Sequence, residues 1–165
     1  MLSEASREVI FNLVKDNHST VSLTWHELTN TYSAQVIYGD QDIDRSYPCI
    51  ALEWRRIRGV VAGMMGDHFD ADETLYFEIA ATNELNEDGS GNIPGSVIAR
   101  RAMADIIYKA ENDWNATLLA QSPKVAFMPP VINIEGKRGR MEDQYIYTYA
   151  FIMRFIYIVD RTQTI

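Results

Sequence analysis

The spacing of apolar residues divides most of this chain into helices and strands before any other property is considered. Two stretches repeat apolar residues every three or four positions, which is the spacing of one helix face. Behind Ser3, a good N-cap residue, the first stretch predicts an amphipathic helix over residues 4–16. The second predicts a helix over residues 96–120, about 37 Å long, that ends before Pro123. The stripe residues are Ala5, Val9, Ile10, Leu13 and Val14 in the first helix and Ala99, Met103, Ile106, Ile107, Ala110, Trp114 and Leu118 in the second.

Elsewhere apolar and polar residues alternate, which is typical of strands. The alternation predicts strands over residues 48–55 and 73–82, and two further extended runs over residues 124–135 and 143–160. Between these last two runs, the segment Gly136 to Arg140 contains two glycines and three basic residues and predicts a turn. The polar stretch 19–46 shows only a brief alternation and predicts no clear element.

The resulting element order, α-β-β-α-β-β, predicts an α+β fold. We expect a single, mainly antiparallel or mixed sheet of about four strands, with two helices packed on one face. The chain has 165 residues, which is within the usual size range of one domain, so we expect residues 1–165 to form a single domain.

The last extended run is largely apolar on both sides. One side carries Tyr145, Tyr147, Tyr149, Phe151, Met153, Phe155, Tyr157 and Val159, and the other carries Ile146, Thr148, Ala150, Ile152, Arg154, Ile156 and Ile158. An antiparallel strand with two apolar faces needs cover on both, whereas helices on one side of a sheet supply only one cover. We therefore expect a neighbouring subunit to supply the second cover.

Charge and cysteine content narrow the classes of protein. Lys and Arg total 15 against 23 Asp and Glu, and the net charge of -8 disfavours a protein whose main task is to grip nucleic-acid phosphates. Cys49 is the only cysteine, which favours a reducing compartment and a buried structural thiol. Residues 1–15 place Glu4, Arg7 and Glu8 among the apolar residues, unlike a signal peptide or membrane anchor. We expect a soluble intracellular protein with no membrane partner.

The motifs that could carry catalysis or bind a cofactor all fail on spacing. Residues 67–73 hold the densest set of metal-ligand types, but no helical His–His or Glu–His pairing accompanies them. The acids of residues 40–44 resemble the start of a calcium loop, but Arg45 and Ala51 stand where glycine and glutamate are required. The glycines of residues 89–95 match neither a dinucleotide fingerprint nor a P-loop. We expect no catalytic residues, no cofactor and no bound metal.

Two basic groups stand out against the acidic background. They are Arg55, Arg56 and Arg58 after a predicted strand, and Lys137, Arg138 and Arg140 in the predicted turn. Such groups are usually solvated surface, and the functional hypothesis is that they meet an acidic patch on an identical neighbour or another partner. Candidate acids are Asp67, Asp70, Asp72 and Glu73. We predict that subunit or partner contacts are made by both basic groups and by Tyr145, Tyr147 and Tyr149.

The arrangement of elements resembles the tail terminator, or tail completion, proteins of tailed bacteriophages. The residues that suggest it are the opening helix Glu4 to Lys15, the strand entry Tyr47 to Leu52, the strand Leu75 to Ala81 leading to the helix Ser96 to Ala120, and the closing aromatic strand Tyr145 to Val159. The likeness covers most of the chain, and it is one of size, order and pattern rather than of a short motif.

The resemblance implies a structural virion protein of the tail or neck, made in the host cytoplasm, that is not an enzyme. Subunits of the family form a ring, commonly a hexamer, that caps the tail tube and joins it to the head-side connector. The implied partners are other copies of the chain, the tail tube, the head-side connector and, as a further candidate, the sheath. DNA passes through such a ring without tight binding, and a negative net charge suits that conduit because it repels phosphates.

Other hypotheses stay open beside this one. The chain is alternatively another small neck or tail-tube component of the virion, a cytosolic ligand-binding α+β domain, or an enzyme built on residues 67–73. The oligomeric state, measured as the mass under native conditions, distinguishes the virion components from the other two hypotheses. A bound metal ion would distinguish the enzyme.

Overall fold

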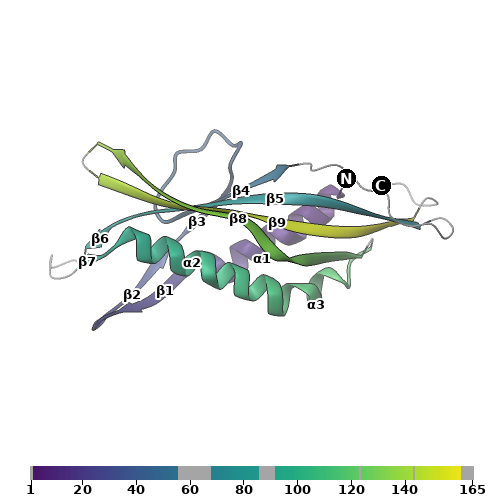
Figure 1. Cartoon of the computed structure of the whole chain (residues 1–165), viewed down its shortest axis with the longest axis horizontal. Helices are drawn as coiled ribbons and strands as arrows, with labels where there is room; N and C mark the ends of the chain where they lie inside the picture. Colours follow the sequence, from purple (N-terminus) through teal and green to yellow (C-terminus); the bar gives the residue numbers. More distant parts are fainter. Residues whose placement is uncertain (1, 56–67, 86–91, 123, 143, 161–165) are drawn as a thin grey trace.

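The computed structural model describes residues 2–55, 68–85, 92–122, 124–142 and 144–160, and it has the predicted α+β class. A five-stranded sheet is covered on one side by the helices, as Figure 1 shows. We call the side toward the helices the inner face and the opposite side the outer face. Among the described helices, none is long and apolar enough to cross a membrane.

The helices form where the apolar periodicity predicts them. Helix α1 spans Glu4–His18, and the Ser3 hydroxyl oxygen caps it by accepting a hydrogen bond from the Ser6 backbone N–H at 3.1 Å. The second helical run comprises α2 (Gly95–Lys109), the π-helical turn η1 (Ala110–Trp114) and α3 (Asn115–Leu118). Both runs bury their stripes in the same core, with Ile10, Val14, Ile106, Trp114 and Leu118 almost fully inaccessible.

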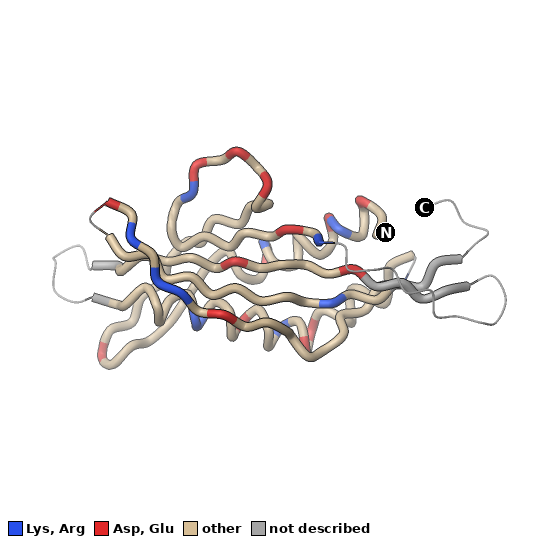
Figure 2. The backbone as a smooth tube through the Cα atoms, turned by 45° about the horizontal axis from the view of Figure 1, so that its top comes forward, with Lys and Arg blue, Asp and Glu red and all other residues tan. Residues whose placement is uncertain are grey.

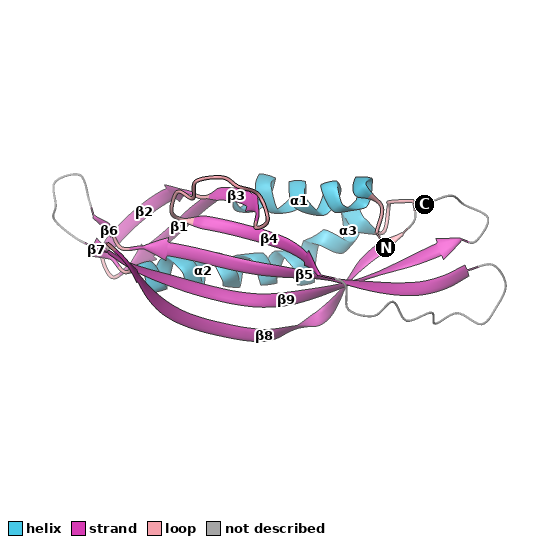
Figure 3. Cartoon of the chain, turned by 90° about the horizontal axis from the view of Figure 1, so that it is seen from above, coloured by secondary structure: helices cyan, strands magenta, loops and turns pink. Residues whose placement is uncertain are grey.

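The main sheet holds five strands in the order β3-β4-β5-β9-β8, seen from above in Figure 3. They are β3 (Gln35–Tyr38), β4 (Cys49–Arg55), β5 (His68–Thr82), β8 (Val125–Met141) and β9 (Gln144–Asp160). Strands β3 and β4 are parallel, and the other neighbours are antiparallel. The predicted layout of about four strands is therefore wrong by one strand, β3, which the sequence did not indicate.

The polar stretch 19–46 supplies this missing strand and a hairpin. Strands β1 (Thr20–Trp25) and β2 (Leu28–Ser33) pair with each other, and Val21 and Leu23 of β1 are buried. A further short pair is formed by β6 (Glu84–Leu85) and β7 (Asn92–Ile93). These strands are short or carry many polar residues, so tertiary packing rather than local periodicity specifies them.

The predicted turn from Gly136 to Arg140 is wrong, because these residues continue strand β8. Lys137 pairs with Thr148 of β9, and the chain reverses only after Met141, where Glu142 has a φ of 53°. Glycine and charged residues are typical of turns, but here β9 extends equally far and offers the basic segment a ladder partner. We call residues 135–141 the β8 arm.

The pairing of β5 with β9 positions the core on the inner face. Phe77 lies opposite Phe151, and their stacked rings are fully buried with centroids 4.8 Å apart. The same alternation turns Leu75, Met153 and Phe155 toward the helices, and all three are buried. Burial of this row of large side chains is the main source of stability that joins the sheet to the helices.

Helix α2 begins very close to the end of β5. A Cβ atom on Gly95 would lie 2.7 Å from the Thr82 carbonyl carbon and 2.8 Å from the Ala81 carbonyl oxygen. We therefore predict that Gly95→Ala lowers the free energy of unfolding by about 1–3 kcal/mol, the usual cost of overpacking. Urea unfolding followed by circular dichroism measures this change.

Gly139→Ala is the matched control, because a Cβ atom at Gly139 meets nothing within 4 Å. This variant should change the free energy of unfolding by less than ~0.5 kcal/mol. Equal unfolding midpoints for the two variants would contradict the close approach of α2 to β5.

Candidate functional site

The outer face of the sheet is covered in part by the chain itself. Tyr47 packs over a buried cluster formed by Ile37 of β3 with Cys49 and Ala51 of β4. Tyr47 ends the segment that connects β3 to β4, and we call residues 39–46 of this segment the acidic loop. The chain thus covers its own sheet over β3 and β4, and the cover that we expect from a neighbouring subunit over the closing strand β9 stays a prediction.

Over β9 and β8 the outer face is more open. Tyr76 and Ile152 are half-buried, and the Ile132 side chain is 40% exposed. These three residues pair in register across β5, β9 and β8, so their side chains form one row on the outer face. We call this row the outer patch. An apolar row of this kind on an exposed sheet face is a common feature of protein interfaces.

The acidic loop is tied down at its base and leaves its carboxylates free. The Gln35 side chain donates a hydrogen bond to the Asp44 carbonyl oxygen at 3.2 Å and accepts one from the Ser46 backbone N–H at 2.9 Å. Arg45 forms an ion pair with Glu78 of β5 at 2.7 Å. Asp40, Asp42 and Asp44 are exposed, and the described part of the chain places no cation within ion-pair distance of them.

The β8 arm concentrates positive charge at the opposite edge of the sheet. Lys137, Arg138 and Arg140 are all exposed, and no carboxylate of the described residues pairs with them. The Arg138 guanidinium lies over the Tyr145 ring, 4.7 Å from its centroid, which orders the arm by a cation–π contact. Figure 2 shows the acidic segments of the loop after β3 and the basic segments of β8 as two separate stretches of the backbone.

The structure does not bring the two predicted basic groups together. Arg55 lies at the end of β4 in register with Arg154 of β9, whereas Lys137 pairs with Thr148, six residues along the same strand. Arg55 and Lys137 are therefore separated by about 20 Å along the strands at ordinary rise, and by three strand spacings, about 14 Å, across the sheet. Arg55 stacks over the Tyr76 ring at 3.9 Å and pairs with Glu53 at 3.2 Å. Arg56 and Arg58 lie outside the described residues.

The three predicted contact tyrosines differ in exposure. Tyr145 is 43% exposed beside the β8 arm. Tyr147 is half-buried and approaches Gly95 at the start of α2, and Tyr149 is half-buried and packs against the core. Part of the surface of Tyr147 and Tyr149 is thus used inside the subunit, and the contact predicted for all three stays a prediction.

Glu73 is not the surface acid that the sequence suggested. Its side chain is buried, and its carboxylate accepts hydrogen bonds from the Arg7 guanidinium and, at 2.9 Å, from the Leu2 backbone N–H. Glu73 therefore anchors the amino-terminal segment to β5. Asp67 and the side chains of Asp70 and Asp72 lie outside the described part of the chain.

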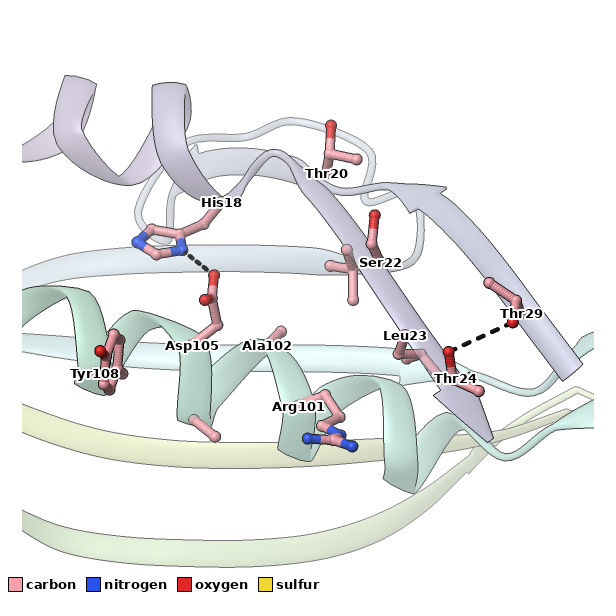
Figure 4. Close-up of a pocket in the computed structure, with 12 residues that line it drawn as sticks. His18, Thr20, Ser22, Leu23, Thr24, Thr29, Arg101, Ala102, Asp105 and Tyr108 are labelled. Atoms are coloured by element: carbon pink, nitrogen blue, oxygen red, sulfur yellow. Dashed lines mark hydrogen bonds and ion pairs between the residues drawn. The ribbon is translucent and has the colours of Figure 1, made fainter. Parts of the chain in front are cut away.

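A groove of about 640 Å³ lies between β1 and α2, and Figure 4 shows the residues that line it. Its wall includes five consecutive residues of β1, Thr20–Thr24, so the groove follows the strand edge that β2 does not occupy. Hydroxyl pairs cross the hairpin beside it, Ser22 with Thr31 at 3.1 Å and Thr24 with Thr29 at 3.4 Å. These hydroxyl groups are thus already paired within the hairpin.

His18 joins the end of α1 to α2 at one end of this groove. Its Nδ1 lies 2.8 Å from the Asp105 carboxylate, and its ring is buried near Trp114. Burial lowers the pKa of His18, while the hydrogen bond to Asp105 acts in the opposite direction and Lys109 adds to the lowering. The pair connects two helices, and the sequence pattern did not indicate it because the two residues are far apart along the chain.

The predicted burial of Cys49 is confirmed. The Cys49 side chain is buried, and this burial raises the pKa of its thiol, which disfavours a nucleophilic thiolate. Within the described ranges, no three His, Cys, Asp or Glu side chains are grouped so that they could hold a metal ion.

The acidic loop is the surface feature that sequence reasoning passed over. Its alternating aspartates resemble the start of a calcium loop, but three exposed acids between two strands are also a signal of a charged surface. Compared with known proteins, the sequence matches no protein-family model and no curated protein. The surface features that can indicate a function are therefore the outer face, the acidic loop and the β8 arm.

We predict that His18 makes the protein less stable as the pH falls. Because its pKa is lower in the folded state, the unfolded chain binds more protons below about pH 6.5, and unfolding becomes easier. The free energy of unfolding should therefore fall between about pH 7.5 and the folded pKa, and it should fall less in His18→Asn. Urea midpoints over this pH range measure the difference.

His26→Asn is the control for this measurement, because His26 is exposed in the turn between β1 and β2 and has a positive φ that Asn tolerates. Its pH profile should follow that of the wild type. A His18→Asn profile parallel to the wild type would contradict the assignment.

Proposed function

We propose that this chain is a structural subunit of a ring that caps the tail tube of a tailed bacteriophage and joins the tail to the head-side connector. The observation that carries the proposal is the outer patch. The chain covers its own outer face over β3 and β4, and Arg55 stacks on Tyr76 of β5, but Ile132 of β8 is left exposed and Ile152 of β9 half-buried in the same row.

A second copy of the chain supplies the simplest cover for this patch. Ile132 and Ile134 are 40% and 55% exposed on the edge strand β8. Exposed edge strands with apolar side chains promote association, and soluble proteins usually protect them. Contact of this edge with a different surface of the next subunit is heterologous, and heterologous contacts build a ring when the rotation between copies closes.

The charge of the chain supports a conduit for DNA. Each subunit carries a net charge of -8, so a ring of several copies has a strongly negative potential and repels the phosphate backbone. Such a ring holds the tail together while DNA slides through it. The fold class and the order of the long elements agree with the resemblance to tail terminator proteins. The same features fit another small neck or tail-tube component. The number and position of copies of this chain in purified particles would distinguish the two functions.

We predict that the protein has the mass of a multimer, with six copies in assembled tails. Native mass spectrometry and light scattering measure this in solution, and microscopy of assembled particles measures it in the tail. The variant Ile132→Asp should weaken self-association by about tenfold or more, because it places a charge in the proposed interface.

Leu119→Asp is the matched control for this variant. Leu119 is 49% exposed at the end of the helical run, away from the outer patch, so its replacement should leave the mass unchanged. A protein that is monomeric both in solution and in particles would contradict the ring. Equal effects of the two variants on the mass would show that the outer patch is not part of the contact between subunits.

We also predict that duplex DNA binds weakly, with a dissociation constant no tighter than the ~10⁻⁴ to 10⁻⁶ M nonspecific range at about 150 mM salt. The reason is the net charge, together with the separation of Arg55 from the β8 arm. Fluorescence anisotropy with labelled duplex measures the affinity. Submicromolar binding that is lost in Lys137→Glu would instead identify the β8 arm as a phosphate-binding surface.

A further inference from the structure

We propose that the acidic loop of one copy docks on the β8 arm of the next copy. This inference rests on the proposed function, since it names the contact by which copies of the chain join. Three exposed carboxylates, Asp40, Asp42 and Asp44, then meet the exposed cations Lys137, Arg138 and Arg140. Both sets lack partners of opposite charge within the described part of their own subunit. Complementary charges of this kind specify orientation and accelerate encounter.

The two surfaces belong to opposite edges of one sheet. The acidic loop follows β3, the first strand in the sheet order, and the arm is the end of β8, the last strand. Four strand spacings separate the two edge strands, about 19 Å, and the end of the loop, at Arg45, reaches over the outer face to line one cavity with the arm. A contact between opposite edges of two copies is a head-to-tail contact, and it closes into a ring when the rotation between copies allows. The contact geometry is thus the one that a ring requires.

Apolar side chains accompany the charges on both surfaces. Ile43 lies between two aspartates of the acidic loop and is 47% exposed. On β8, Ile132 and Ile134 are exposed just before the arm begins. Ile43 therefore has an apolar surface to cover when the aspartates reach the arm. Burial of these residues supplies affinity, while the charged groups around them specify the partner.

Both surfaces are also ordered before they meet. The loop is held at its base by Gln35 and by the Arg45–Glu78 ion pair. The arm is held by its ladder to β9 and by the Arg138–Tyr145 contact. Two surfaces that are already ordered lose little conformational entropy on binding, so this cost reduces their affinity only slightly.

The test exchanges the charges of the two surfaces. The arm variant is Lys137→Glu with Arg140→Glu, which keeps Arg138 on Tyr145, and the loop variant is Asp42→Lys with Asp44→Lys. Each variant should weaken self-association about tenfold or more in sedimentation experiments. The chain that carries all four substitutions should recover association, because its arm and loop are again opposite in charge.

Matched controls change the net charge equally at other exposed positions. Arg100→Glu with Arg101→Glu on α2 is the control for the arm variant, and Glu8→Lys with Asp16→Lys on α1 is the control for the loop variant. Both controls should associate as the wild type does. Association of the wild type should also weaken as salt rises from about 0.01 to about 0.15 M and the Debye length falls from about 30 to about 8 Å.

The outcomes separate this inference from the proposed function. A wild type that never self-associates, in solution or in particles, contradicts the ring itself. Self-association that neither reversal weakens overturns the docking of loop on arm and leaves the ring standing. A folded four-substitution chain that stays dissociated also overturns it. If the arm variant no longer joins tails but still self-associates as the wild type does, the docking of loop on arm is also overturned, because the arm then contacts a different partner.

Discussion

The pairing of β5 with β9 is the constraint on which the rest of this structure depends. It runs from His68 opposite Asp160 to Thr82 opposite Ile146 without a break in register. Because side chains alternate along a strand, this single register decides which residues face the helices and which face outward. It stacks Phe77 on Phe151 inside and leaves Tyr76 beside Ile152 outside. A shift of one residue would reverse both faces.

The same pairing places two different edges on the sheet. On one side of the β5–β9 pair, β4 and the short β3 lead into the acidic loop, and on the other side β8 carries the basic arm. The aspartates of the loop and the cations of the arm form no ion pair with each other within the described part of one subunit, although Arg45 at the end of the loop lines one cavity with Lys137 and Arg140. Unpaired charges of both signs on one subunit favour contacts between copies.

Elements with a strong local pattern could be predicted from the sequence. The stripe of Ile10 and Val14, the alternation through Leu75 and Phe77, and the long aromatic strand all followed from periodicity. Strand β3 could not be predicted, since it has four residues and depends on pairing with β4. The glycines of the β8 arm suggested a turn because composition does not reveal a partner strand. The sequence suggested that Glu73 is a surface acid, because its partner Arg7 is remote in sequence.

The negative charge of the whole chain and the basic β8 arm are compatible once the two are assigned to different places. In the proposed ring, three carboxylates of one copy and three cations of the next cancel at each contact. The net charge of -8 per subunit then belongs entirely to surfaces outside these contacts, including any that face the channel. Self-docking thus removes the cations that would otherwise bind DNA phosphates. An isolated subunit, with its arm exposed, should therefore attract DNA more strongly than the same subunit in a ring.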